Sequence, residues 1–517
     1  MTTGNFIHFR EFYANRKENT VNTIKQGMSL LLALAMLLAL GTTALAASAS
    51  APKTITVRAV EDHFTSKAHD EEWSFLYSDE YFAESGYEFR QDLASMTLGL
   101  AMASFTSRDA INEGDHQTEN RNFVDLCRQI GFSDPQCNED MKKPTTKESI
   151  GVNCAYRKRP DGSTLVALGI RGDVYRSEWG GNLLVGAEGP HQNWALCRDK
   201  ALSFLKEYLA KEGITGRIKL WTTGYSRSGA VSNLVAGKLD DGYDLGNGAT
   251  LAPEDLYCST FECPRGAVTS EVQDKKYDNI HNVLNENDII TYVCPSQWGM
   301  ARYGKDYLYP SKRTAGADYA ALSEAAKEKL REIPDEVFDR YWPDSYKGLL
   351  GAPDNQRELY DRIMTALTTS FVTSRQDYAD NVQMILSDAV NVWYSRLDKD
   401  VSLSDALKAF ATRVQDNAGT VMAALVTGQG EAVLGQYLAE SLRDENITTY
   451  DYAQMKQALH VLSERMGRMA KAYPVETVNL LLNFINIIAA HDVASNIIWI
   501  YTMPDGYLAA HSEYSWQ

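Results

Sequence analysis

A strand pattern runs directly into a glycine-flanked turn and then into a helix pattern between residues 218 and 239. The apolar run IKLW comes first, TTGYSRSG follows it, and AVSNLVAGKL completes the segment. A serine at such a bend needs small residues two positions before and two after it, because the backbone closes on itself there. Around Ser226 these residues are Gly224 and Ser228. Glycine adopts strained backbone more readily than serine, so Ser226 is a better candidate nucleophile than Ser228. A helix-capping serine is the alternative.

Strand and helix patterns alternate on both sides of this segment, which predicts βαβ units and a mostly parallel sheet flanked by helices. A turn at Pro160-Asp161-Gly162 divides residues 152–170 into two strands of a hairpin. The other predicted elements are a helix at 194–212, strands at 218–223, 257–261 and 281–284, and a helix at 226–239.

Beyond about residue 315 the strand patterns stop and nearly every segment reads as helix, with prolines between the segments. One example is AQMKQALHVLSERMGRMAKAY, and another is VETVNLLLNFINIIAAHD. No fixed repeat period is visible, so a solenoid is not predicted. This region is either a separate helical domain or a large insertion into the α/β unit.

Composition and charge exclude several classes of partner. The 517 residues are 44% hydrophobic and 10% aromatic, which is typical of a globular protein. The formal net charge of −17 argues against a nucleic-acid partner, because phosphate binding needs a positive surface. The chain has no polybasic patch for an anionic membrane.

The first 46 residues resemble a secretory signal. Lys25 precedes the apolar run MSLLLALAMLLALG, and small residues follow at Ala44 and Ala46. We expect cleavage after Ala46 and a secreted protein. The apolar run is short for a membrane span, and an uncleaved N-terminal anchor is the alternative.

Seven cysteines follow the leader, and export would permit disulfides. The odd number leaves at least one thiol unpaired within the chain, and the sequence does not decide which cysteines pair. No CxxC motif and no His/Cys spacing fits a zinc site. We infer no metal and no cofactor.

Several motifs in order around the turn resemble the class 3 lipase family of α/β-hydrolases. IRG and EWGGN precede the turn together with HQNW, and FECPRG and NEND follow it. The GYSR turn, FECPRG and WGMARYG are most similar to secreted lipase-like proteins of clostridial bacteria. The resemblance covers roughly residues 75–305 and is looser beyond them. It implies an α/β-hydrolase fold.

A nucleophilic serine needs a histidine base, and the histidine needs a carboxylate. In this fold the order along the chain is Ser, Asp, His. Asp288 follows an apolar strand and matches the family's acid position, with Glu286 and Asp278 as local rivals. The base must then be His460, His491 or His511.

The spacing of neighbouring residues favours His491 as the base. His460 lies within a charged helix pattern. His491 precedes Trp499 by eight positions, as a similar histidine does in the clostridial relatives, although the Pro-Glu that follows it there is absent. His511 resembles the His-x-x-Tyr end of fungal relatives and stays the alternative.

The oxyanion hole needs backbone N–H donors. Arg227, directly after the candidate nucleophile, supplies one, and the family position after IRG assigns the second to Asp173. Relatives often carry Ser or Thr there, and an ionised aspartate would repel an oxyanion. Either the Asp173 side chain points away or the hole is built around Gly172. His191 matches a family position before the turn and is interpreted as structural.

These observations predict four parts: a signal peptide (1–46), an α/β-hydrolase core (47–305), a helical insertion or cap (306–487), and a return to the core that carries the base (488–517). The predicted function is a secreted serine hydrolase of lipid or other acyl esters, with transient contact to a lipid interface. A non-catalytic binding or cell-surface module on the same fold is the alternative. The sequence leaves the oligomeric state open.

Overall fold

The computed structural model describes residues 52–61, 69–105, 120–172, 180–186, 188–294, 296–331, 404–448, 452–482 and 493–516, with single residues between these ranges that include Glu178 and His491. The predicted leader lies outside the described residues. None of the described helices is long and apolar enough to cross a membrane.

An eight-stranded sheet forms the centre of the α/β part, in the order β12-β11-β9-β7-β6-β5-β4-β3. Five adjacent strands are parallel, and β3, β4 and β12 pair antiparallel to their neighbours. The parallel strands are β5 (Thr164–Ile170), β6 (Gly216–Tyr225), β7 (Ala249–Phe261), β9 (Ile280–Leu284) and β11 (Lys305–Leu308); the others are β3 (Ser133–Cys137), β4 (Val152–Lys158) and β12 (Ser512–Glu513). The expected α/β fold with a mostly parallel sheet is confirmed.

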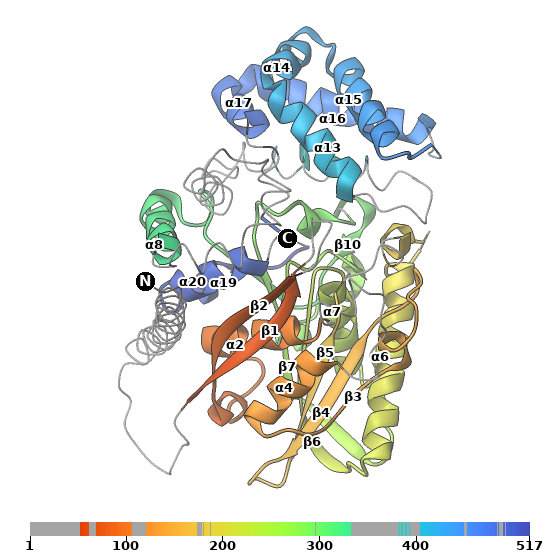
Figure 1. The fold of residues 1–517 in the computed structure, drawn as a ribbon, viewed down its shortest axis with the longest axis vertical. Coiled ribbons are helices and arrows are strands. Elements are labelled where there is room, and N and C mark those ends of the chain that lie inside the picture. Colours follow the sequence, from red (N-terminus) through yellow and green to blue (C-terminus); the bar gives the residue numbers. More distant parts are fainter. Residues whose placement is uncertain are drawn as a thin grey trace, which may run out of the picture.

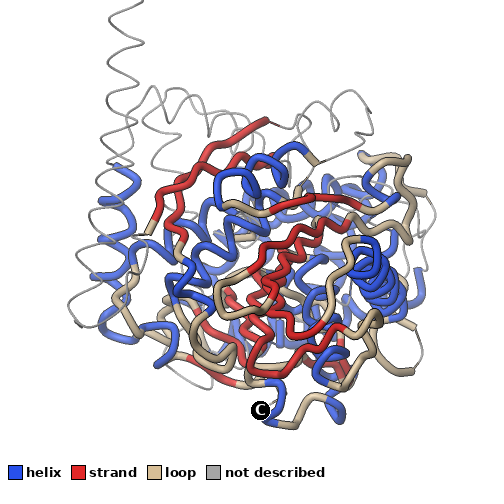
Figure 2. Tube along the Cα trace, turned by 90° about the horizontal axis from the view of Figure 1, so that it is seen from below, coloured by secondary structure: helices blue, strands red, loops and turns tan. Residues whose placement is uncertain are grey.

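Helices cover both faces of the sheet, so residues on both faces of its central strands are buried. Successive residues of β6 point to opposite faces. Trp221 Nε1 donates to Thr97 Oγ1 in α2 (Gln91–Ala103) at 2.8 Å, whereas Thr222 Oγ1 lies 3.3 Å from Ser232 Oγ in α7 (Arg227–Asp240). Figure 2 shows the strands in the middle of the molecule with helices around them.

The remaining elements of the α/β part pack on these layers. On the side of α7 lies α6 (Gln192–Lys211). On the side of α2 lie α4 (Arg121–Ile130) and the hairpin of β1 (Lys53–Glu61) and β2 (His69–Tyr77). The hairpin predicted at residues 152–170 is present as β4 and β5, with Lys158 opposite Thr164.

The described chain between β11 and β12 is helical. Five helices, α13–α17, pack on one another and form one group at the top of Figure 1. They are α13 (Ser404–Asp416), α14 (Ala418–Thr427), α15 (Gly430–Asp444), α16 (Tyr452–Ala472) and α17 (Pro474–Leu482). In contrast, α8 (Tyr319–Arg331) packs on α19 (Val493–Thr502), which also contacts α2. The predicted boundary between residues 305 and 306 falls within β11, a strand of the central sheet, and the domain division stays a prediction.

All seven cysteines are buried and none forms a disulfide. Burial raises the pKa of the Cys127, Cys154 and Cys258 thiols well above their usual value. The structure thus contains none of the disulfides that the sequence left open, and the seven buried thiols pack as small apolar groups.

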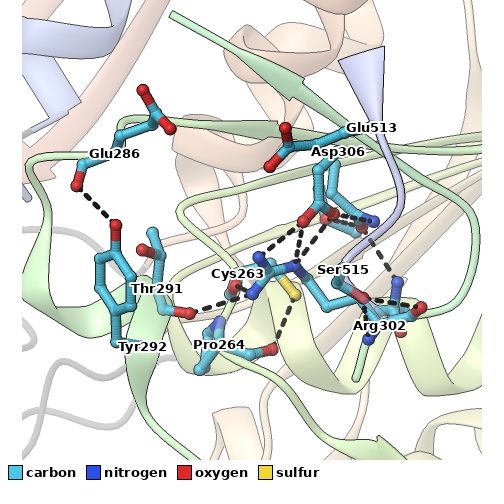
Figure 3. Close-up of polar contacts among 12 residues, drawn as sticks. Cys263, Pro264, Glu286, Thr291, Tyr292, Arg302, Asp306, Glu513 and Ser515 are labelled. Atoms are coloured by element: carbon cyan, nitrogen blue, oxygen red, sulfur yellow. Dashed lines mark hydrogen bonds and ion pairs between the residues drawn. The ribbon is translucent and has the colours of Figure 1, made fainter. Parts of the chain in front are cut away.

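The buried side chain of Arg302 connects β11 and the segment after β12 with the end of β7 (Figure 3). Its guanidinium donates to both carboxylate oxygens of Asp306, with a shortest distance of 2.7 Å, and to the carbonyls of Cys263 (2.9 Å) and Thr291 (3.0 Å). Its backbone N–H donates to Ser515 Oγ at 2.8 Å. The segment after β12 is thereby fastened to the end of β7.

Asp306→Asn should strongly destabilise this arrangement, because it leaves the guanidinium buried without a counter-charge. Arg302 and Asp306 are both 3% exposed, and breaking a buried pair in this way costs about 3–5 kcal/mol. Urea unfolding followed by tryptophan fluorescence measures the loss. The control is Asp125→Asn, whose partner Arg128 is exposed; it should cost less than about 1 kcal/mol. Equal losses in the two variants would contradict the role of Arg302.

Candidate active site

Ser226 stands at the bend between β6 and α7, as the sequence predicts. Its φ of 59° and ψ of −128° lie in a region that residues with a side chain rarely adopt. The Ser226 N–H donates to the Phe261 carbonyl at 2.9 Å, which fixes the bend to the end of the neighbouring strand β7. Ser226 is partly exposed, whereas its neighbours in the chain are buried.

The small residues around Ser226 allow this backbone. A Cβ on Gly224 would lie 2.1 Å from the Ser228 carbonyl oxygen. Ser228, the rejected candidate nucleophile, is buried; its Oγ accepts from the Tyr225 N–H and donates to the Tyr225 carbonyl, both at 2.9 Å. The two serines therefore differ in kind: Ser228 closes the turn and Ser226 presents its hydroxyl.

His491 and Asp288 meet Ser226 in a hydrogen-bonded triad. His491 Nε2 lies 2.8 Å from Ser226 Oγ, and His491 Nδ1 lies 2.5 Å from Asp288 Oδ2. Asp288 follows β9 and is fully buried, and its Oδ1 accepts the Ile290 N–H at 2.8 Å. With Nδ1–H pointing at the carboxylate, Nε2 is the ring nitrogen that faces the serine hydroxyl as its proton acceptor.

The other candidates lie elsewhere. His511 stacks on Tyr507 and its Nδ1 lies 2.7 Å from the Tyr507 carbonyl. His460 is exposed in α16, where Nδ1 lies 2.8 Å from Glu431. Of the rival carboxylates, Glu286 is bound to Ser311 and Arg313, and Asp278 to Lys305 and Tyr514.

Two residues that sequence reasoning did not single out support the triad. The hydroxyl of Tyr225 donates to the His491 carbonyl at 2.9 Å and accepts from Asn496 Nδ2 at 2.9 Å. Glu262, directly after β7, is hydrogen-bonded through its side chain to Asp288. Tyr225 belongs to the GYSR motif and Glu262 to the FECPRG motif. Membership of these motifs was the sequence signal that could have identified them.

Arg227 is the first residue of α7, and a helix does not use the N–H groups of its first turn. Its guanidinium points away from Ser226 and donates to the carbonyl of Ser149 (3.0 Å) and to Asn193 Oδ1 (3.2 Å). The side chain thus anchors the helix start, and the backbone N–H is what Arg227 offers beside the Ser226 hydroxyl.

The second predicted oxyanion donor, Asp173, lies outside the described residues. On either side of this gap, Arg171 and Glu178 form an ion pair whose side chains are each 1% exposed. Gly172 packs against the bend, since a Cβ there would lie 3.2 Å from the Tyr225 carbonyl oxygen. The end of β5 therefore lies beside the nucleophile candidate.

Burial raises the pKa of the Asp288 carboxyl from its usual value to about 8, while hydrogen bonds from Glu262 and the Ile290 N–H lower it. Burial and the neighbouring Asp288 charge raise the pKa of Glu262 well above its usual value. Among the described residues, no group of three or more His, Cys, Asp or Glu could hold a metal ion.

His191 lies outside the triad, in accordance with its interpretation as structural. It is fully buried, stacks on Trp194, and caps α6 by accepting the Trp194 N–H at Nδ1 (3.3 Å). Its Nε2 lies 3.1 Å from the Asn182 carbonyl, which requires a proton on that nitrogen. The ring is therefore neutral, and burial lowers its pKa to about 3.

No protein-family model matches the chain, and no curated protein matches it significantly in sequence. The fold is similar to solved lipase structures. Lipase II from Rhizopus niveus is 14% identical, with 42% of this chain and 79% of that chain covered and a TM-score of 0.30. Triacylglyceride lipase from Rhizomucor miehei is 16% identical over 42% and 79%, with a TM-score of 0.29. MDLA from Penicillium cyclopium is 18% identical over 44% and 82%, with a TM-score of 0.28. Values this low establish neither a family nor an activity.

Gly224→Ala should destabilise the α/β part by about 3 kcal/mol, the upper end of the usual cost of overpacking, because the new methyl group would collide with the Ser228 backbone. Gly419→Ala in α14 is the matched control: no atom lies within 4 Å of the added Cβ, and alanine should stabilise that helix by about 0.5–1 kcal/mol. Denaturant unfolding measures both. A neutral Gly224→Ala would contradict the close approach at the bend.

Acidification should destabilise the protein through His191. The unfolded chain binds a proton on this residue below about pH 6.5, whereas the folded chain does not until about pH 3. Between these values the wild type should lose about 1.4 kcal/mol per pH unit through this one site. His191→Asn keeps a cap acceptor and removes the titration. Urea unfolding from pH 7 to pH 4 should give a shallower slope for the variant, and equal slopes would be contrary to this expectation.

Proposed function

We propose that the protein is a serine hydrolase that cleaves carboxylic esters through an acyl-enzyme. The observation that carries this proposal is the continuous hydrogen-bonded chain from Ser226 Oγ through His491 to Asp288, with distances of 2.8 and 2.5 Å. The 2.8 Å between Ser226 Oγ and His491 Nε2 is within the hydrogen-bonding reach that proton transfer from nucleophile to base requires.

The reaction follows from the roles of the three side chains. Ser226 Oγ attacks the ester carbonyl carbon while its proton passes to His491 Nε2, and the Asp288 carboxylate stabilises the imidazolium. The tetrahedral intermediate expels the alcohol, which takes the proton from Nε2, and leaves the acyl group on Ser226. Water, deprotonated by Nε2, then attacks the acyl carbonyl, releases the acid and restores the serine hydroxyl.

The oxyanion of each tetrahedral intermediate is assigned to two backbone N–H groups. One is that of Arg227, at the positive end of α7. The other belongs to the turn after β5, where Asp173 or Gly172 stands. Because the Arg227 guanidinium is held by Ser149 and Asn193, its charge is directed away from the reacting carbonyl.

The proposed substrates are lipid or other acyl esters, and the proposed fold family is that of the α/β-hydrolases, with the clostridial lipase-like proteins as the nearest group. The motifs in IRG, GYSR, FECPRG and NEND support this assignment. The leader supports secretion. Since α13–α17 lie between Asp288 and His491 in sequence, we assign them to a cap over the site. The reaction needs no cofactor.

Ser226→Ala should abolish hydrolysis of p-nitrophenyl esters, with kcat falling about 10⁴- to 10⁶-fold, as when other serine hydrolases lose their nucleophile. A fluorophosphonate probe should label the wild type and not the variant. A panel of short to long acyl chains, with and without emulsified triglyceride, then ranks the substrates.

Ser228→Ala is the matched control, because within the described part of the chain the hydroxyl that it removes bonds only to the Tyr225 backbone. This variant should still react with the probe. If the wild type neither reacts with the probe nor hydrolyses any ester of the panel, the proposal fails and a non-catalytic binding module on the same fold takes its place.

A further inference from the structure

The acid of the triad has a contact that a serine–histidine–aspartate chain does not need. Asp288 is fully buried and accepts two hydrogen bonds, from His491 Nδ1 at 2.5 Å and from the Ile290 N–H at 2.8 Å. Its carboxyl group is also hydrogen-bonded to a second carboxyl group, that of Glu262. Two acidic side chains thus meet directly behind the histidine.

Glu262 is held in this place from both sides. It follows the last residue of β7, and its N–H donates to the Val283 carbonyl in β9 at 3.1 Å. Its two carboxyl oxygens lie 3.1 and 3.0 Å from the Asn285 N. It is 0% exposed, and its φ of 44° lies where glycine is the usual residue. The fold therefore keeps a glutamate at a position that is costly for its backbone.

Two carboxyl groups can hydrogen-bond only if they share a proton, because two carboxylates have no donor between them. The proton belongs on Glu262 for a reason of geometry. Asp288 accepts two N–H groups, one of them from the histidine, whereas Glu262 accepts one backbone N–H. The other titratable groups that interact with Glu262 are His491, Tyr309 and Cys263. No lysine or arginine of the described chain pairs with it.

We propose that Glu262 is a positioning residue of the triad. As a neutral carboxyl group it donates its O–H to the Asp288 carboxylate and holds that carboxylate in place to accept Nδ1–H of His491. Glu262 acts only through Asp288, touches no substrate, and adds no second negative charge behind the histidine. This role rests on the proposed hydrolase function, and the contact itself can be measured without it.

Two substitutions distinguish the hydrogen bond that Glu262 donates from the space that its side chain fills: Glu262→Gln and Glu262→Met. Glutamine keeps an N–H donor for Asp288 and a carbonyl acceptor for the Asn285 N–H, so kcat should stay within about threefold of the wild type. Methionine has a similar length and no donor, so kcat should fall about 10- to 100-fold, the usual weight of a hydrogen bond to a charged group, with KM unchanged.

The acidic limb of the pH profile of kcat/KM gives a readout that packing alone would not move. Without a donor, the Asp288 carboxylate is more basic and stabilises the imidazolium more, so the limb of Glu262→Met should move to higher pH. The acidic limb of Glu262→Gln should remain at the pH of the wild-type limb. If Glu262→Gln instead moves the limb clearly to lower pH, a negative charge has been removed, Glu262 is ionised, and the proposal is overturned. An unchanged kcat and pH profile in Glu262→Met would overturn it as well.

Infrared spectroscopy tests the neutral carboxyl group irrespective of hydrolysis. The wild type at neutral pH should show the C=O band of a protonated, hydrogen-bonded carboxylic acid, and this band should disappear in Glu262→Gln. Its absence from the wild type would refute the inference even in an active enzyme. The band can be present in a protein that neither reacts with a fluorophosphonate nor hydrolyses esters. In that case the hydrolase function and the positioning role are both wrong, whereas the proton shared by Glu262 and Asp288 is confirmed. Melting temperatures show whether each variant is folded, and Glu262→Gln carries the test if Glu262→Met does not fold.

Discussion

The hydrogen bond between His491 and Asp288 joins parts of the chain that are 203 residues apart in sequence, and the rest of the site depends on it. Asp288 is fixed by its own strand, but His491 belongs to a late segment that must return to the sheet. Several separate contacts bring it back: Tyr225 holds the His491 carbonyl, α19 packs on α2 and α8, and β12 pairs with β11. The histidine is thus positioned by its backbone as well as by its ring.

The bend at Ser226 shows how a costly local conformation is kept. The serine and the glutamate after β7 both have positive φ, and they occupy the ends of adjacent parallel strands. Each is tied to the next strand by a backbone hydrogen bond, Ser226 to Phe261 and Glu262 to Val283. Because the sheet is buried on both faces, it can impose the same kind of strain on two strands and so bring two polar side chains to one edge.

Local patterns were enough to predict part of this arrangement. The strand–turn–helix pattern identified Ser226, and a polar loop after an apolar strand identified Asp288, because in both cases the signal lies within about ten residues. The eight-residue spacing to Trp499 favoured His491 over His511. The contacts that bring His491 to Ser226, such as the packing of α19 on α2 and α8, are not encoded in that spacing. The same holds for Glu262 and Tyr225, whose roles arise from residues distant in sequence. The hairpin of β1 and β2 and the edge strands β3 and β12 were not predicted; β12 has only two residues, too few for any periodicity.

The late arrival of the histidine has a consequence for biosynthesis. A ribosome that has translated as far as residue 308 has completed the parallel strands, the serine and the aspartate, and must still add the helices and α19 before the imidazole exists. A nascent chain that ends before residue 491 therefore carries Ser226 and Asp288 without the imidazole that bridges them. Under the proposed hydrolase function, the order of residues alone delays the assembly of the three groups until the last part of the chain has been made.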